Sequence, residues 1–439
     1  MSPRVYLEFL GCRLNAAETE GLARRFAGVG YEVVDAPAVA DVIVVNSCAV
    51  TTQAARSSRR RLRALHRENP NAELAVTGCW ATGAASQAAQ LPGVRWVIPN
   101  IDKGAVVAEI AGREADPAPW APGRWGHTRA FLGVQDGCDH ACTYCVTRLL
   151  RGPARSRPLT PTVAEVQRLV EQGAQEVVLT GVSLGSYGRD LAPPESLTGL
   201  AGAILADTDL PRLRLSSIEP WDVDAALLRL WEDRRLCRQL HLPLQSGSDA
   251  VLKRMGRPIT VADYTALTDE ARAFSEEIAL TTDILAGFPG ETDRDFRETL
   301  ALVERVGFAR LHVFPYSERA GTPAVRLPEP VPHSVRKERA AELRTLGRRL
   351  AADYRQQFVG QALPVLWEQQ APEGQWTGLT DTYIRVESRA SRDLYNRITP
   401  TRLLAAGRDA LIGEVLLPGS SGAGPSDEPD AAAASGCEV

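Results

Sequence analysis

The sequence of 439 residues predicts an α/β protein with an N-terminal parallel α/β domain, a central partial (β/α) barrel and a small C-terminal β-barrel. Three observations support this fold class. Short apolar runs alternate with helix-length segments over most of the chain. A Pro-rich stretch interrupts the alternation once, and after about residue 360 short alternating strands replace it. Each of these patterns is typical of a different layer architecture.

The N-terminal part is predicted over residues 1–114. Its apolar runs and helical stretches follow one another in turn, which favours a parallel sheet with crossover helices. A segment rich in proline, residues 115–129, is predicted to link this domain to the next one. The predicted strands are 5–10, 41–46, 74–77 and 96–98, and the predicted helices are 15–29 and 52–66.

The central part is predicted over residues 130–358, where the strand and helix alternation resumes. Six such units indicate a partial (β/α) barrel, and ligands of a barrel of this kind bind at the carboxyl ends of the strands. The predicted strands are 131–135, 176–180, 212–216, 239–242, 280–284 and 310–313.

The C-terminal part is predicted over residues 359–418. Its short strands follow one another without helices, which predicts a small β-barrel. The last segment, 419–439, is rich in Gly, Ser, Ala, Pro and Asp and is predicted to be disordered. The predicted barrel strands are 363–368, 375–379, 383–386 and 410–416.

The composition excludes several classes of protein. The formal net charge of −4 gives no sign of a globally basic nucleic-acid binder, so any basic surface must be local. No apolar run approaches the roughly 20 residues needed to span a bilayer, and the N-terminus lacks the apolar core of a signal peptide. Eight cysteines in a chain of this length do not indicate a disulfide scaffold. We therefore expect a cytoplasmic protein, without a membrane partner, whose thiolates bind metal.

Three cysteines form one short motif, Cys138-x3-Cys142-x2-Cys145. Three thiolates at this spacing can hold a cubic iron–sulfur cluster and leave one of its four irons open to a substrate. A zinc knuckle or three buried thiols are the alternatives. Structural zinc normally has four protein ligands, and no fourth Cys or paired His stands nearby. His140 is expected to shape the loop rather than to bind metal.

Three further cysteines, Cys12, Cys48 and Cys79, each follow a predicted strand of the first domain. The carboxyl ends of parallel strands gather along one edge of a sheet, so three thiolates there could hold a second cluster. The alternative is that each is a small buried apolar residue, which is common for a single cysteine.

The first cysteine motif resembles that of the radical S-adenosylmethionine enzymes, and Tyr144 matches the aromatic residue that this family places before its last cysteine. The resemblance implies that Cys138, Cys142 and Cys145 bind a [4Fe-4S] cluster. In that family the open iron chelates S-adenosylmethionine, and an electron from the cluster yields a 5′-deoxyadenosyl radical. Ordinary loop packing is the alternative role for Tyr144.

The second set of cysteines lies in runs similar to those of the methylthiotransferases, which insert a methylthio group into a C–H bond. By resemblance, Cys12, Cys48 and Cys79 bind a second [4Fe-4S] cluster that supplies or carries sulfur. The sequence departs from the family pattern in Trp80-Ala81-Thr82 and after Cys145, where a Pro is commoner. The matching runs are 11–18, 46–51, 77–79, 151–158, 179–188, 214–220, 241–248, 282–292 and 312–317, and the resemblance extends over residues 3–417.

The same resemblance implies a set of residues that contact S-adenosylmethionine. Glycines at strand ends allow close approach of the backbone to a ligand, and polar side chains there can bond its amine or ribose. For each of them a purely structural role in the turn is an equal alternative. The candidates are Tyr144, Gly181, Ser217, Glu219, Gln245 and Gly287.

Two basic segments are candidates for binding RNA. The predicted helix after Cys48 carries Arg59, Arg60 and Arg63 among other arginines, which suggests a phosphate-binding surface, with a solvated helix face as the alternative. The C-terminal segment resembles the TRAM module, a small RNA-binding barrel, and Arg385 and Arg389 are its candidate contacts. Such a barrel could instead be a lid or a dimer contact.

Among the branches of the family, the chain looks most like the threonylcarbamoyladenosine tRNA methylthiotransferases. This implies binding to the anticodon loop of tRNA and conversion of N6-threonylcarbamoyladenosine at position 37 to its 2-methylthio derivative. It also implies two S-adenosylmethionine molecules and an external electron donor such as a flavodoxin or ferredoxin. The alternatives are an enzyme for isopentenyladenosine at the same position, an enzyme for a ribosomal-protein aspartate, and a non-catalytic iron–sulfur RNA-binding protein.

Overall fold

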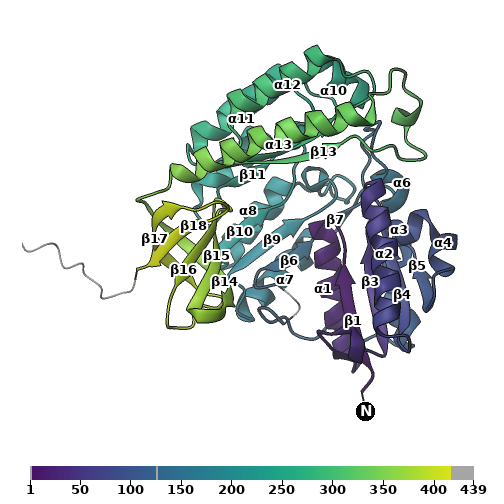
Figure 1. The fold of residues 1–439 in the computed structure, drawn as a ribbon. Helices are drawn as coiled ribbons and strands as arrows, with labels where there is room; N and C mark the ends of the chain where they lie inside the picture. The colour runs from purple at the N-terminus through teal and green to yellow at the C-terminus, as the bar shows by residue number, and fades with distance from the viewer. Residues whose placement is uncertain (1, 125–126, 417–439) are drawn as a thin grey trace, which may run out of the picture.

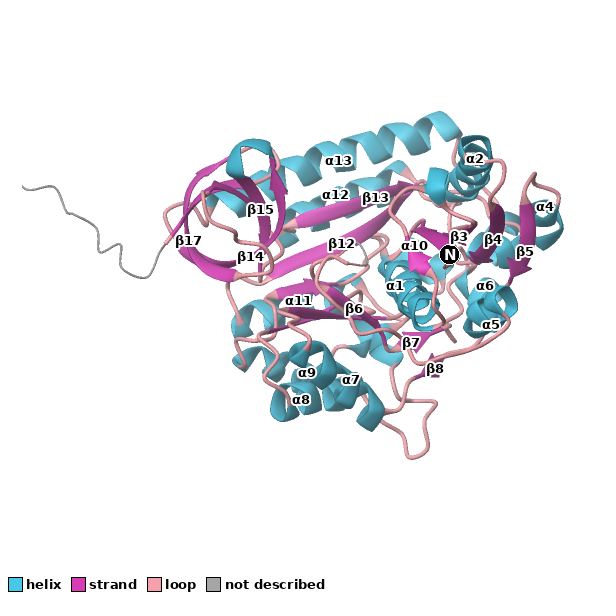
Figure 2. Cartoon of the chain, turned by 90° about the horizontal axis from the view of Figure 1, so that it is seen from below, coloured by secondary structure: helices cyan, strands magenta, loops and turns pink. Residues whose placement is uncertain are grey.

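The computed structural model describes residues 2–124 and 127–416, and its three parts have the predicted α/β architecture (Figure 1). The tail predicted over 419–439, which includes Cys437, lies outside the described residues. Figure 2 shows the C-terminal barrel at one end of the molecule and the N-terminal sheet at the other, with the central strands between them. No helix in the described ranges is long and apolar enough to cross a membrane.

The N-terminal sheet has the strand order β2-β1-β3-β4-β5, and all its pairs are parallel. The two-residue strand β2 was not predicted because so short a run carries no periodicity. The strands are β1 (Arg4–Phe9), β2 (Glu32–Val33), β3 (Val42–Ser47), β4 (Glu73–Gly78) and β5 (Val94–Ile98).

Helices cover both faces of this sheet, so every residue of β3 is buried. Val42 and Val44 pack on the side of α1, whereas Ile43 and Val45 pack on the side of α2. Because successive side chains of a strand point to opposite faces, β3 contributes to two separate hydrophobic cores. The helices are α1 (Arg13–Gly28), α2 (Thr52–Glu68), α3 (Cys79–Gly83), α4 (Ala85–Ala89) and α5 (Val106–Ala111).

The central strands form two parallel sheets, β10-β9-β6 and β11-β12-β13. Parallel bridges from Leu213 to Leu236 and from Ser217 to His241 join β10 to β11, which makes one curved layer of six strands. The predicted partial barrel is therefore confirmed. Its strands are β6 (Ala130–Gly133), β9 (Glu176–Thr180), β10 (Arg212–Leu215), β11 (Gln239–His241), β12 (Ala279–Ala286) and β13 (Arg310–Pro315).

Helices pack on the convex side of this layer and share one large core with the strands. A short antiparallel pair, β7 (Gln135–Asp136) with β8 (Arg155–Ser156), lies beside the first cysteine motif. The helices are α6 (Thr147–Arg151), α7 (Leu159–Glu171), α8 (Leu197–Asp207), α9 (Ala225–Arg229), α10 (Asp249–Met255), α11 (Val261–Phe274), α12 (Asp293–Val306) and α13 (His333–Gln356).

The C-terminal part is a closed barrel with strand order β14-β15-β16-β18-β17. Strand β17 was not predicted, and Pro400 within it is unfavourable in the interior of a sheet. The third strand was predicted too early, since Tyr383 has a φ of +67° and β16 begins after it. The strands are β14 (Ala362–Ala371), β15 (Gln375–Thr380), β16 (Arg385–Arg389), β17 (Ile398–Ala406) and β18 (Leu411–Val415).

Buried charges attach this barrel to the central domain. The fully buried Arg214 donates to Glu176 at 2.6 Å and to the carbonyl oxygen of Asp381 at 2.9 Å. The Tyr383 ring lies 4.8 Å from the Arg214 guanidinium carbon and 5.0 Å from that of Arg13, at the start of α1. One loop of the C-terminal barrel therefore contacts both other parts of the chain.

Candidate metal centres

The first cysteine motif forms a loop beside the β7 and β8 pair. Gly137 enters the loop at a φ of +72°, and a Cβ there would lie 1.9 Å from the carbonyl oxygen of Pro153, so only glycine fits. The Thr143 N–H donates to the carbonyl oxygen of Met255 at 2.9 Å, and the Thr143 carbonyl oxygen accepts from the Ala324 N–H at 2.9 Å. The loop is thus held by two distant segments of the central domain.

The thiols of this loop form a soft donor set with partial burial. Burial raises the pKa of Cys138 to about 11, and it raises that of Cys142 to about 11 against the opposing charge of Arg257. Metal binding requires deprotonated thiolates, and a bound cation offsets the free energy that it costs to bury their negative charge. Three such thiols in one loop fit an iron–sulfur cluster better than four-ligand zinc. His140 bonds the hydroxyl of Ser183 at 3.1 Å, which gives it a role in shaping the loop.

The second cysteine set gathers at the carboxyl edge of the N-terminal sheet. Cys12 follows β1, Cys48 follows β3, and Cys79 begins α3 directly after β4. Cys48 and Cys79 are buried, and Cys12 is exposed. A Cβ on Gly11 would lie 2.7 Å from the Cys48 sulfur, so the glycine lets the two cysteine loops approach. Burial raises the pKa of Cys48 to about 11.

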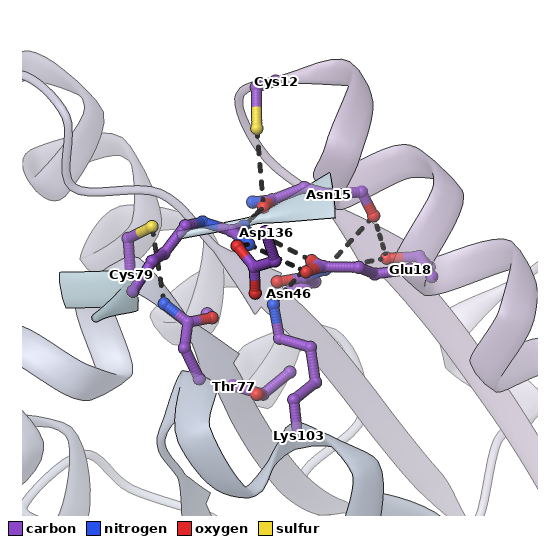
Figure 3. A network of polar contacts seen from close by, with 12 residues as sticks. Cys12, Asn15, Glu18, Asn46, Thr77, Cys79, Lys103 and Asp136 are labelled. Atoms are coloured by element: carbon purple, nitrogen blue, oxygen red, sulfur yellow. Dashed lines mark hydrogen bonds and ion pairs between the residues drawn. The ribbon is translucent and has the colours of Figure 1, made fainter. Parts of the chain in front are cut away.

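A polar network lies beneath this edge (Figure 3). The Asn15 side-chain amide donates to the carbonyl oxygens of Leu10 at 2.7 Å and Ser47 at 3.3 Å, which ties the first two cysteine loops together. The Cys12 sulfur lies 3.6 Å from the Asn15 Oδ1 atom. The Asn100 amide lies 3.6 Å from the Cys79 sulfur, so amide groups contact two of the three thiols.

Glu18 is the centre of the charged part of this network. Lys103 lies 2.5 Å from its carboxylate, Arg151 donates to it at 2.9 Å, and the Asn46 amide donates to it at 3.0 Å. Burial alone would raise the pKa of Glu18, but the charges of Lys103 and Arg151 hold it at about 2. Arg151 also donates to Asp136 at 2.7 Å, so the network extends to the strand that precedes the first cysteine loop.

Two of the candidate cofactor contacts, Tyr144 and Glu219, meet at one arginine. The buried Arg257 donates to the Glu219 carboxylate at 2.8 Å and to the Tyr144 hydroxyl at 3.3 Å. Its guanidinium carbon lies 4.7 Å from the centroid of the Trp221 ring. This arrangement orients a phenol and a carboxylate beside Cys142, whose pKa the Arg257 charge affects.

The other four candidates lie at the carboxyl ends of the barrel strands. Gly181 follows β9, and a Cβ there would lie 2.9 Å from the Gln135 Oε1 atom. Ser217 pairs with the end of β11, and Gln245 adopts a φ of +71°, which is strained for a residue other than glycine. A Cβ on Gly287 would lie 2.5 Å from Arg336, so its glycine is already required by packing.

The arginines of α2 divide into two groups. Arg61 pairs with Glu8 at 2.7 Å and serves the fold, and Arg59 is half-buried. The exposed side chains recur at intervals of three and four residues, so they share one face of the helix. These residues, named here the α2 arginine stripe, are Arg56, Arg60, Arg63 and Arg67.

The candidate RNA contacts of the C-terminal barrel are both exposed on β16. Arg385 has no charged partner in the described structure, whereas Arg389 lies 3.7 Å from the exposed Glu373. A pair of this kind contributes little to stability, so Arg389 stays available to another anion.

Sequence reasoning missed Arg257 and Lys103. Neither belongs to a recognisable spacing, because each reaches its partner across the fold: 38 positions separate Arg257 from Glu219 and 85 separate Lys103 from Glu18. A buried cation opposite a buried carboxylate is visible only once the elements are assembled. Glu18 and Arg151 lie in the motifs described above, but the sequence indicated no role for either residue.

Comparison with known proteins gives two family matches. Residues 4–98 match the Uncharacterized protein family UPF0004, and residues 132–303 match the Radical SAM superfamily. Among solved structures, the radical S-adenosylmethionine methyltransferase TsrM from Kitasatospora setae aligns with a TM-score of 0.53 over 74% of each chain. At 16% identity this likeness shows the fold alone.

Curated relatives match over most of the chain. The threonylcarbamoyladenosine tRNA methylthiotransferase MtaB of Thermotoga maritima is 38% identical over 88% of this chain and 92% of its own length. The Bacillus subtilis MtaB is 33% identical over 91% and 93%. The tRNA-2-methylthio-N(6)-dimethylallyladenosine synthase of Geobacillus thermodenitrificans is 35% identical over 83% and 74%. With its cysteine triads and its partial barrel, the chain belongs to the radical S-adenosylmethionine methylthiotransferase family.

Proposed function

We propose that the chain is a tRNA methylthiotransferase that converts N6-threonylcarbamoyladenosine at position 37 to its 2-methylthio derivative. The observation that carries this proposal is the link between the two cysteine triads: Arg151, six residues after Cys145, bonds both Asn15 and Glu18 near Cys12. A radical centre and a sulfur centre must act on one base, so their separation has to be fixed. The names of the Thermotoga maritima and Bacillus subtilis relatives, which the chain matches over about nine tenths of its length, support the choice of base.

In this proposal Cys138, Cys142 and Cys145 hold the [4Fe-4S] cluster that membership of the radical S-adenosylmethionine family implies. When bound, the cluster and S-adenosylmethionine supply one-electron reduction and radical chemistry that no side chain can perform. The chain orients the cofactor through Arg257, which aims Tyr144 and Glu219 at the same region. A carboxylate there is suited to the amine or ribose hydroxyls of the cofactor.

Cys12, Cys48 and Cys79 hold a second cluster in this proposal and carry the sulfur that is transferred. The thiols fit such a group because they meet at one sheet edge, where Gly11 leaves room beside the Cys48 sulfur. Lys103 and Arg151 lie under this edge, where the carboxylates of Glu18 and Asp136 balance their charges and the network holds the cysteine loops in place.

RNA would bind along the α2 arginine stripe and the C-terminal barrel, where Arg59, Arg385 and Arg389 add positive charge. The stripe lies on the helix whose N-terminal segment contacts Cys48, because the Ser58 hydroxyl donates to the Cys48 carbonyl at 2.9 Å. Backbone phosphates bound there would direct the anticodon loop toward the thiols. A cytoplasmic location and an external donor such as a flavodoxin or ferredoxin complete the proposal.

The test is methylthiolation of synthetic anticodon stem-loops by the anaerobically reconstituted enzyme. One stem-loop carries threonylcarbamoyladenosine at position 37 and its match carries dimethylallyladenosine, and mass spectrometry of the nucleosides reads both. Faster conversion of the first supports the proposal. Preference for the second would assign the chain to the other tRNA branch, and activity on neither would direct the search to a ribosomal-protein aspartate.

A further inference from the structure

Three side chains outside both cysteine triads converge inside the central barrel. His241 lies on β11, Asp283 on β12 and His312 on β13, which are neighbouring strands. The Asp283 Oδ1 atom is 3.4 Å from His241 Nε2 and 3.1 Å from His312 Nδ1. In the described ranges, this is the one group of three His, Cys, Asp or Glu residues whose ligand atoms all lie within 4.8 Å of one another.

The strand pattern directs these three side chains to the concave side of the layer. Their apolar neighbours along the strands, Leu240, Leu280, Ile284 and Val313, belong to the core shared with the outer helices. Successive side chains of a strand point to opposite faces, so the polar three face the barrel interior. The Asp283 and His312 side chains keep 27% and 38% of their surface exposed, which leaves them accessible from that interior.

The two spacings from Asp283 to the histidines are compatible with a metal ion, and all three ligand atoms lie within 4.8 Å of one another. Tetrahedral bonds of about 2.0–2.1 Å to nitrogen and oxygen place neighbouring ligand atoms about 3.3 Å apart, close to the 3.4 and 3.1 Å observed here. The other His241 nitrogen, Nδ1, lies 2.8 Å from the Thr281 hydroxyl. This contact holds the ring so that Nε2 faces Asp283, as outer-shell partners do for metal-binding histidines.

We infer that His241, Asp283 and His312 bind one divalent first-row transition-metal ion, separate from both cysteine triads. Two imidazoles and one carboxylate form a donor set of intermediate hardness that suits Mn²⁺, Fe²⁺, Co²⁺ or Zn²⁺. The remaining coordination positions open toward the barrel interior and take oxygen ligands.

The site borders the residues proposed to contact the cofactor. Ser217 pairs with His241 across the two sheets, and the Gln245 N–H donates to the Asp283 carbonyl at 2.8 Å. The strained φ of Gln245 lies at this junction. An ion here would stand inside the same barrel, yet its binding depends on none of the six cysteines, so it can be tested apart from the proposed reaction.

The rival arrangement is a hydrogen-bonded cluster without metal, and Mn²⁺ binding separates the two. The full chain is first loaded with iron and sulfide so that its thiols are occupied, and a chelator then removes iron outside the clusters. The chain is kept oxidised, because oxidised [4Fe-4S] clusters give no EPR signal. Free Mn²⁺ is then counted by EPR during titration. We expect one Mn²⁺ to bind per chain in addition to the iron of the two iron–sulfur clusters. If His241, Asp283 and His312 form only a hydrogen-bonded group, no saturable Mn²⁺ binding should be seen.

Matched variants locate the ion. Asp283→Asn and His312→Phe should abolish Mn²⁺ binding, and Thr281→Val should weaken it by about 10–100-fold. His333→Gln, an exposed histidine at the start of α13, serves as the control and should bind as the parent does. Equal binding by Asp283→Asn and the parent would overturn the inference. The iron content of every variant reports whether it is folded.

Discussion

The Arg151 guanidinium donates to the Glu18 carboxylate at 2.9 Å, and this pair joins the helices that follow the two cysteine sets. Arg151 ends α6, which begins two residues after Cys145, and Glu18 lies in α1, which begins directly after Cys12. One ion pair therefore spans the interface between the N-terminal and central parts. It is buried, so its loss has a larger cost than the loss of a surface pair.

Replacing Arg151 by Met should destabilise the fold and uncouple S-adenosylmethionine cleavage from methylthiolation. Breaking a buried pair costs about 3–5 kcal/mol, because the remaining carboxylate keeps only part of its compensation. We expect a lower melting temperature and more 5′-deoxyadenosine per methylthiolated base. Arg155→Met is the control, since its side chain is 41% exposed and lies 3.5 Å from Asp136. An unchanged ratio of the two products would contradict the positioning role of Arg151.

Removing one cysteine from each of the two sets should give two different defects in the reaction. Cys142→Ala should lose S-adenosylmethionine cleavage, whereas Cys48→Ala should retain cleavage and lose sulfur insertion, and each variant should keep about half of the iron, that of the other cluster. Cys237→Ala removes a buried cysteine outside both sets and should retain all the iron. Iron analysis and product chromatography measure these outcomes. Full methylthiolation by Cys48→Ala would refute the sulfur-cluster assignment.

Arg60→Gln and Arg63→Gln in the α2 arginine stripe should weaken tRNA binding in a salt-dependent way. Each lost phosphate contact lowers the slope of log affinity against log salt by about 1. Binding isotherms at several salt concentrations measure that slope. Arg305→Gln, an exposed arginine on α12, should leave it unchanged. If all three variants behave alike, the stripe is a solvated helix face.

Glu20→Gln should stabilise the protein increasingly as the pH rises. Burial raises the pKa of Glu20 from 4.5 to about 8, so its stabilising protonated form is fully retained below pH 4.5 and is lost toward pH 8. Within this window stability falls by up to about 1.4 kcal/mol per pH unit. Glutamine does not titrate, so the gain in melting temperature should be larger at pH 8 than at pH 6. Exposed Glu32→Gln should show no such trend.

Tyr383 should matter for its ring rather than its hydroxyl. The guanidinium carbons of Arg13, Arg129 and Arg214 lie 5.0, 5.5 and 4.8 Å from the ring centroid. Tyr383→Ala leaves three cations around a cavity. Truncating a fully buried aromatic costs about 3–5 kcal/mol, and the half-buried Tyr383 should cost less. Tyr383→Phe keeps the stacked ring and should melt close to the parent. Thermal unfolding compares them, and an equal loss in both variants would point to the hydroxyl instead.

Much of the fold could be predicted from local sequence pattern. The apolar runs of β3 and β9 and the helical spacing of α2 are signals contained in a single segment, and the structure has them where the pattern indicates. Strand β17 was missed because Pro400 is tolerated only where its pairing needs no N–H, a condition set by the partner strand β14. Likewise, the φ of +67° at Tyr383 belongs to the turn between β15 and β16, where the Tyr383 N–H donates to the Thr380 carbonyl at 3.1 Å, and the residue type does not indicate it.

Only those parts of the site whose residues lie close together along the chain could be predicted from the sequence. Cys138, Cys142 and Cys145 lie within one loop, so their motif is visible in the sequence. Arg257, in the loop after α10, has its role only through Glu219, in the loop after β10. The His241, Asp283 and His312 group exists only because three strands lie side by side in this register. Contacts between distant segments depend on the assembled barrel, and no single-segment pattern contains them.

The docking of the C-terminal barrel through Arg214 and Tyr383 has a consequence for how an RNA is chosen. Buried contacts fix the barrel to the central strands, and the Tyr383 ring also contacts Arg13 of α1, so side-chain contacts link the barrel that carries the exposed Arg385 to the part that carries the α2 arginine stripe. If both surfaces bind one RNA, as proposed above, the fixed separation between them would favour a stem whose length brings its loop to the thiols.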